Sequence, residues 1–137
     1  KITQLTQKKH VSKVKVRYAE TDQMGVVHHS NYPIYCELAR TEWLETFGVS
    51  YREMEENGIM LPLSNLNVDY KKPAKYNDEL FIITSLKKMV GARIEFAYRI
   101  EDSNKQLVAQ VFTTLVFVDM KTGRPTRCPE DLFKLLS

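Results

Sequence analysis

The chain has 137 residues, of which 43% are hydrophobic and 27% are charged, and its net charge is +3. This length and composition are typical of one globular domain and exclude a disordered chain. Its 20 basic and 17 acidic residues include no basic run, so the sequence predicts no nucleic-acid-binding surface.

The sequence also predicts no membrane-spanning segment and no disulfide or thiolate metal site. No apolar run approaches the ~18 residues of a membrane-spanning helix, and the first ten residues lack the apolar core of a signal peptide. Cys36 and Cys128 form no CxxC pair, so neither a disulfide framework nor a thiolate metal site is predicted. We therefore expect a single domain over residues 1–137 that works in the cytoplasm with reduced thiols.

The first predicted elements are a strand and a long helix. Residues 11–19 alternate β-branched or aromatic residues with Lys and Arg, which predicts a half-exposed strand. Residues 31–47 predict a helix that Ser30 or Asn31 caps and Gly48 ends. Its apolar residues recur at intervals of three and four and share one face: Tyr32, Tyr35, Cys36, Ala39, Trp43 and Phe47. Ile34, Leu38 and Leu44 widen this apolar region, so we expect the helix to be buried on more than one side.

The rest of the chain is mostly strand. After a short helical turn at 51–57, strands are predicted over 61–70, 79–88, 93–101 and 106–119, and a short helix follows at 129–136. The links between the last three strands are short, which predicts an antiparallel meander. One sheet and one long helix pack best when the sheet wraps around the helix, so we expect an α+β fold.

The stretch "ETDQMGVVHHSNYP" joins the first strand to the long helix. A helix N-terminus carries free N–H groups and a partial positive charge, which can hold an oxyanion. Asp22 precedes it and can act as nucleophile or general base, so the pair could hydrolyse an acyl group. The alternatives are that Asp22 is a turn residue and that His28 and His29 are loop residues. The histidine spacing predicts no metal site.

The segment "VRYAETDQMGVVHHSNYPIYCELARTEWL" resembles the hotdog-fold acyl-CoA thioesterases, and within them the YbgC-type branch of the 4-hydroxybenzoyl-CoA thioesterase family. "DYKKPAKYNDEL" and "FVDMKTGRP" extend the resemblance over nearly the whole chain. Met24 departs from the pattern, since a small residue is common there, and this leaves the substrate choice open. The matching residues are Tyr18, Asp22, Gly25, Val26, Val27, His29, Asn31, Tyr32, Ala39, Arg40 and Glu42.

The resemblance implies a hotdog fold, with a five-stranded antiparallel sheet around one long central helix, and a role for each motif residue. Asp22 is expected to be the catalytic carboxylate. The backbone N–H of His29 is expected to polarise the thioester carbonyl, while its side chain positions substrate or water. Tyr18 is expected to support the pocket, and Gly25 and Asn31 to contact the substrate.

Coenzyme A also needs a phosphate-binding site. Lys71, Lys72 and Lys75 lie on the loop after strand 61–70 and are the candidates, although a solvated basic loop is the alternative reading. No cofactor and no metal ion is implied. The exposed edge and apolar flank of such a sheet predict a homodimer or homotetramer with sites at the subunit boundary.

Two other functions are compatible with the same fold. A hydratase or dehydratase acting on a β-hydroxyacyl thioester would pair a histidine with an acid on the helix, for which Glu37 and Glu42 are candidates. A non-catalytic protein that binds acyl-CoA or an acyl carrier would keep the pocket without needing an ionised Asp22. Release of free thiol from acyl-CoA distinguishes the hydrolase from both.

Overall fold

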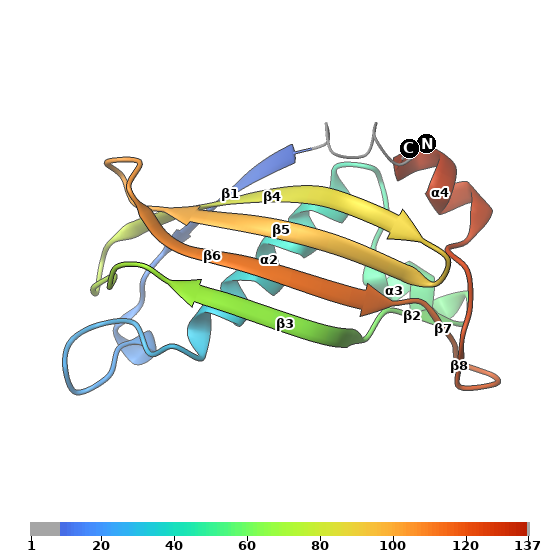
Figure 1. Ribbon diagram of the computed structural model, residues 1–137, viewed down its shortest axis with the longest axis horizontal. Coiled ribbons are helices and arrows are strands. Elements are labelled where there is room, and N and C mark those ends of the chain that lie inside the picture. The colour runs from blue at the N-terminus through green and yellow to red at the C-terminus, as the bar shows by residue number, and fades with distance from the viewer. Residues whose placement is uncertain (1–8, 137) are drawn as a thin grey trace.

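The computed structural model describes residues 9–136. Its main feature is a five-stranded antiparallel sheet, in the order β1-β4-β5-β6-β3, laid over one long helix, α2 (Figure 1). The predicted α+β architecture is therefore confirmed. The main strands are β1 (Lys9–Lys15), β3 (Leu63–Tyr70), β4 (Glu79–Val90), β5 (Arg93–Glu101) and β6 (Leu107–Val116).

The predicted meander is confirmed, because β4 pairs with β5 and β5 with β6, both antiparallel. Alternate residues of β5 are buried, as the pattern of Ile94, Phe96, Tyr98 and Ile100 predicted. The strand predicted over 106–119 is interrupted at Phe117, whose N–H donates to the carbonyl of Ala92. The residues beyond this break form β7 (Val118–Asp119), which pairs with two short strands, β2 (Ile59–Met60) and β8 (Arg124–Pro125).

The central helix α2 spans Asn31–Glu45 and is about 22 Å long at 1.5 Å per residue. The predicted buried face of α2 is confirmed from Tyr32 to Trp43. The chain leaves the helix through Gly48, whose φ of +76° favours glycine. We expected Ile34 and Leu38 to be buried too, but they are 55% and 45% exposed in the single chain. One flank of α2 is therefore apolar and open.

The first strand is shorter than predicted. β1 ends at Lys15, and the chain then forms a single 3-10 turn, η1 (Tyr18–Glu20). The alternating pattern continues past Lys15 only as far as Val16, which is buried, while Tyr18 is 77% exposed. This early end leaves residues 21–30 free to form a loop that leads into α2.

The smaller elements lie at the far end of the sheet from this loop. They are α3 (Tyr51–Glu56), the short three-stranded sheet and α4 (Glu130–Leu136), and Figure 1 shows them opposite the loop before α2. None of the helices within residues 9–136 is long and apolar enough to span a membrane.

Candidate active site

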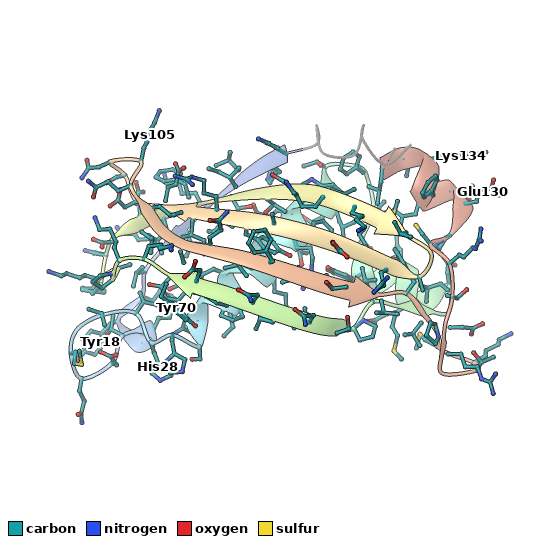
Figure 2. The ribbon with its side chains drawn as sticks, in the orientation of Figure 1. Tyr18, His28, Tyr70, Lys105, Glu130 and Lys134 are labelled. Carbon is teal, nitrogen blue, oxygen red and sulfur yellow. The ribbon has the colours of Figure 1, made fainter. Side chains whose placement is uncertain are left out.

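The loop at residues 21–30 lies at one end of the molecule, beside the C-terminal end of β3 (Figure 1). In Figure 2 the labelled side chains of Tyr18, His28 and Tyr70 gather at this end, whereas Glu130 and Lys134 of α4 lie at the other. Two isolated bridges fix the loop: Thr21 pairs with Val27, and Val26 pairs with Lys75. Two segments that are distant in the sequence, residues 18–30 and 70–75, therefore meet here.

Asp22 closes a tight turn inside the loop. Its Oδ1 accepts hydrogen bonds from the backbone N–H of Met24, at 2.8 Å, and of Val26, at 3.4 Å. The turn returns through Gly25, whose φ of +80° is in the left-handed region that favours glycine. Because both bonds use Oδ1, the loop is held by one carboxylate oxygen, and the other has no partner within the described residues.

The backbone N–H groups between the turn and the helix are almost all occupied. The N–H of Val26 donates to the carboxylate of Asp22, that of Val27 to the carbonyl of Ala74, and that of His28 to the carbonyl of Glu20. The N–H of Ser30 donates to the ring of His28, that of Asn31 to the carbonyl of His28, and that of Tyr32 to the carbonyl of His29. The N–H of His29 is the one in this run without an acceptor in the described part of the chain. It stands just before the first turn of α2, where the partial charge of the helix is positive.

The two histidine rings stack, with centroids 4.1 Å apart, and both are exposed in the single chain. His28 Nδ1 lies 2.8 Å from the hydroxyl of Ser30, so Ser30 does not form the side-chain cap that we expected. The hydroxyl of Tyr70, at the end of β3, donates to the carbonyl of His29 at 3.2 Å. Tyr70 thus ties the helix entrance to the sheet.

Glu20 lies beneath the loop and holds it from two sides. Its carbonyl accepts from the N–H of His28 and from the side-chain amide of Asn31, and its carboxylate accepts from the Tyr35 hydroxyl at 2.8 Å. The same carboxylate accepts from the backbone N–H and the guanidinium of Arg17. Burial alone would raise the pKa of the Glu20 carboxyl, but these hydrogen bonds hold it below the ordinary value of 4.5.

The lowered pKa makes Glu20 a source of pH-dependent stability. Its contribution is present above the unfolded-state pKa of about 4.3 and is lost as the pH falls through the lower folded-state pKa. We expect Glu20→Gln to lose part of this contribution at pH 7 and to be less sensitive to acid. Urea midpoints at pH 7 and in the acid range test this, with the exposed Glu130→Gln as control. An equal acid sensitivity of Glu20→Gln and the wild-type protein would contradict it.

The lysine loop packs against this site. Lys71 and Lys72 line a hollow of about 280 Å³ together with His29, Tyr32 and Tyr70. Lys71 Nζ is 3.0 Å from a carboxylate oxygen of Asp69, and Lys72 Nζ is 2.8 Å from one of Asp102. No ion pair is found for Lys75 within residues 9–136. Two of the three predicted phosphate ligands are therefore paired with acids in the free protein.

The remaining predicted residues have different surroundings. Asn31 uses its side-chain amide to hold the loop, through the carbonyls of Glu20 and His28. Tyr18 is exposed and packs edge-on against Tyr76, with ring centroids 5.8 Å apart. Met24 is 82% exposed, so its side chain does not fill the hollow beside His29.

The cysteines do not offer an alternative nucleophile. Cys36 is buried within α2, Cys128 is half-buried near α4, and both are free thiols. Burial raises the pKa of each thiol to about 12, so neither is a thiolate at neutral pH. Asp22 and the donor at the helix entrance are therefore the candidate groups for chemistry at this end of the molecule.

Sequence reasoning missed Glu20 and Tyr70 as parts of the site. The "ETD" triplet showed Glu20 only as an acid two residues before Asp22, and Tyr70 was the last residue of a predicted strand. Their roles come from contacts with His28 and His29 across a turn and across the sheet, which no local spacing reveals.

Comparison with known proteins gives a consistent set of relatives. The thioesterase-like superfamily matches residues 16–136. YneP of Bacillus subtilis is 35% identical over 118 residues, which are 85% of this chain and 86% of YneP. The acyl-CoA thioester hydrolase YbgC of Escherichia coli is 30% identical over 87% of this chain and 89% of its own. A DHNA-CoA thioesterase from Staphylococcus aureus superposes with a TM-score of 0.88 at 32% identity, covering 93% of this chain and 87% of that chain.

Proposed function

The chain belongs to the thioesterase-like superfamily and has its hotdog fold, and on that premise we propose that it hydrolyses acyl-CoA thioesters to a free acid and coenzyme A. The observation that carries the proposal is the presence in one loop of a carboxylate oxygen of Asp22 and the N–H of His29, both without a partner in the described residues. A hydrolase needs a base or nucleophile and an oxyanion donor at one carbonyl.

In the proposed reaction, the thioester carbonyl oxygen accepts a hydrogen bond from the His29 N–H. The free carboxylate oxygen of Asp22 either attacks the carbonyl carbon, giving an anhydride that water then hydrolyses, or takes a proton from an attacking water. In both routes the carbon–sulfur bond breaks, and coenzyme A leaves as a thiolate that takes up a proton. The His29 side chain positions substrate or water, and Tyr18 supports the pocket from its outer edge.

Coenzyme A would lie across the lysine loop. Gly25 and Asn31 would lie nearest the thioester, Lys71 and Lys72 line the hollow, and Lys75 adds positive charge farther along the same loop. Because Lys71 and Lys72 are already paired with acids, phosphate binding requires them to exchange partners. Lys75, whose backbone bridges Val26 of the catalytic loop, is the lysine best prepared for this role.

The test of the proposed function is incubation of the purified protein with a panel of acyl-CoA substrates and a thiol-reactive dye. Release of free thiol supports hydrolysis. Hydration of an enoyl-CoA without thiol release would support the hydratase, for which the structure leaves Glu37 as the available acid, since Glu42 lies 3.6 Å from His10. Binding without either reaction would identify a non-catalytic acyl-CoA or acyl-carrier binding protein.

The proposal includes a homodimer or homotetramer. β3 is an edge strand with an unpaired side, and the exposed Leu63, Leu66, Ile34 and Leu38 form an apolar surface beside it. Pairing of two such surfaces covers both the edge and the apolar residues. We expect light scattering at micromolar concentration to give at least twice the mass of the chain, and Leu66→Lys to lower it. A monomeric wild-type protein would contradict this prediction.

A cytoplasmic location is the remaining part of the proposal. It is supported by the two free cysteines, because unpaired thiols persist where the cell keeps them reduced.

A further inference from the structure

A second cavity lies between α2 and β3, farther along the helix than the catalytic loop. It has a volume of about 330 Å³ and is mostly apolar, with Ile34, Leu63, Leu66 and Leu115 in its walls. Arg40 and Thr113 are the polar groups at its inner side. The cavity is therefore an apolar compartment with a cation at one end.

Arg40 is buried, with 8% of its surface exposed. Its Nε donates to the Tyr51 hydroxyl at 2.7 Å, and one terminal nitrogen donates to the Tyr98 hydroxyl at 2.9 Å. Tyr98 in turn shares a hydrogen bond of 2.8 Å with Thr113. These contacts fix the guanidinium in place and leave the second terminal nitrogen without a partner in the described part of the chain.

The partners of Arg40 are neutral. Burial raises the pKa of both phenols, that of Tyr98 to about 12, so neither is ionised at neutral pH. Arg40 forms no ion pair within residues 9–136. A buried charge is costly unless an opposite charge compensates it, and an arginine cannot lose its proton to avoid that cost. Within the described residues, one terminal nitrogen of the guanidinium is therefore free to bind an anion that enters the cavity.

The second cavity follows the hollow beside the catalytic loop along the same two elements, α2 and β3. The first hollow, beside His29, is bounded by Tyr32 of α2 and Tyr70 of β3, and the second by later residues of α2 and earlier residues of β3. From Asn31 to Arg40 the helix rises about 13 Å. From Tyr70 to Leu66 the strand spans about 13 Å as well. Measured along either element, the second cavity therefore lies about 13 Å from the helix entrance.

We propose that Arg40 binds a carboxylate at the far end of the acyl group, so that the enzyme prefers medium-length acyl-CoA substrates with an acidic terminus. This inference rests on the proposed thioesterase function. An extended chain advances about 3.5 Å per three bonds, so about eleven bonds separate the thioester carbon from the terminal carboxylate. The guanidinium fork matches a carboxylate in shape and charge.

Glu37 is the one acid that also lines the cavity, one turn before Arg40. Its side chain is exposed, so solvent screens its charge more than that of the buried guanidinium. Glu37 should weaken the binding of an anionic terminus without preventing it. Glu37→Gln is then expected to increase the preference for acidic substrates.

The experiment compares substrates that differ only at the terminus. Dodecanedioyl-CoA, as the single thioester, is compared with dodecanoyl-CoA, and adipoyl-CoA and hexanoyl-CoA serve as the short pair. The measured quantity is the ratio of kcat/KM for the acidic substrate to that for the methyl-terminated one. We expect the ratio to exceed one for the long pair and to be lower for the short pair.

Variants of Arg40 and Glu37 test the assignment. Arg40→Met should lower the long-pair ratio by about 10- to 100-fold, the range for a lost hydrogen bond to a charged group. Arg52, on α3 next to Tyr51, is largely exposed, and Arg52→Met should leave the ratio unchanged. Glu37→Gln removes a carboxylate from the cavity wall and should raise the long-pair ratio.

Each outcome decides the matter. An equal long-pair ratio in wild-type and folded Arg40→Met proteins would overturn the proposal, as would a wild-type preference for methyl-terminated chains at every length. If Arg40→Met does not fold, equal long-pair ratios in Glu37→Gln and wild-type proteins would overturn it. If no acyl-CoA is hydrolysed, the proposed function fails, and calorimetry with dodecanedioic and dodecanoic acids makes the same comparison by binding.

Discussion

Replacing Asp22 with asparagine should lower the rate of acyl-CoA hydrolysis by about 10²-fold or more, the range for lost acid–base catalysis. The structure makes this substitution conservative, because asparagine keeps the Oδ1 that accepts from the N–H groups of Met24 and Val26. The turn is therefore preserved. What is lost is the negative charge and the second carboxylate oxygen, which are the features that the reaction needs.

The measurement is kcat with short acyl-CoA substrates, together with acyl-CoA affinity by calorimetry. Asp131→Asn, at the exposed start of α4, is the matched control and should retain full activity. His29→Ala should cost less than Asp22→Asn, because the backbone N–H remains. Undiminished turnover in Asp22→Asn would remove Asp22 from the mechanism. A loss of binding in a folded Asp22→Asn protein would instead assign the acid to substrate binding.

Replacing Trp43 with alanine should lower the free energy of unfolding by about 3–5 kcal/mol, the usual cost of emptying a buried aromatic site. Trp43 is 1% exposed and stands where α2 meets the sheet. Its ring lies 5.2 Å from that of Phe96 on β5 and 4.8 Å from that of Phe47, measured between centroids. Alanine would remove the ring contacts of Trp43 with Phe96 and Phe47 and would loosen the contact that positions α2.

Trp43→Phe is the matched control. The indole N–H of Trp43 is buried and has no hydrogen-bond partner within the described residues, so phenylalanine loses no bond. An unsatisfied buried donor costs about 1–3 kcal/mol, and removing it offsets much of the smaller ring's lost packing. We expect urea unfolding at one protein concentration to show a far smaller change for Trp43→Phe. Equal losses for the two variants would show that the indole nitrogen has an unseen role.

The fold was largely predictable because its signals are local. The alternation in β5 and the short links of the meander depend on neighbouring residues, and both predictions are confirmed. The break at Phe117 was not predicted, since it depends on a hydrogen bond to Ala92 on a different segment. The burial of α2 was overestimated because Ile34 and Leu38 face the open side of the single chain.

The site was predictable only in part, for the same reason. The position of Asp22 and of the helix entrance follows from adjacent residues, and the structure brings both into one loop where, among the described residues, the N–H of His29 has no acceptor. The support from Tyr70 and the buried setting of Arg40 depend on contacts across the fold. Arg40 in particular belonged to a matched motif in the sequence, but nothing in its spacing showed that its partners would be two tyrosines.

The pairing of β1 with β4 has a consequence for how the protein is made. Lys15 pairs with Glu79, so the first strand emerges from the ribosome long before its partner exists. The meander strands β4 to β6 can form contacts with near neighbours, and such local contacts form fastest. The loop that carries Asp22 lies between β1 and α2 and is bridged at Val26 to Lys75. We therefore expect catalytic competence to be acquired late in folding, after the sheet has recruited its N-terminal strand.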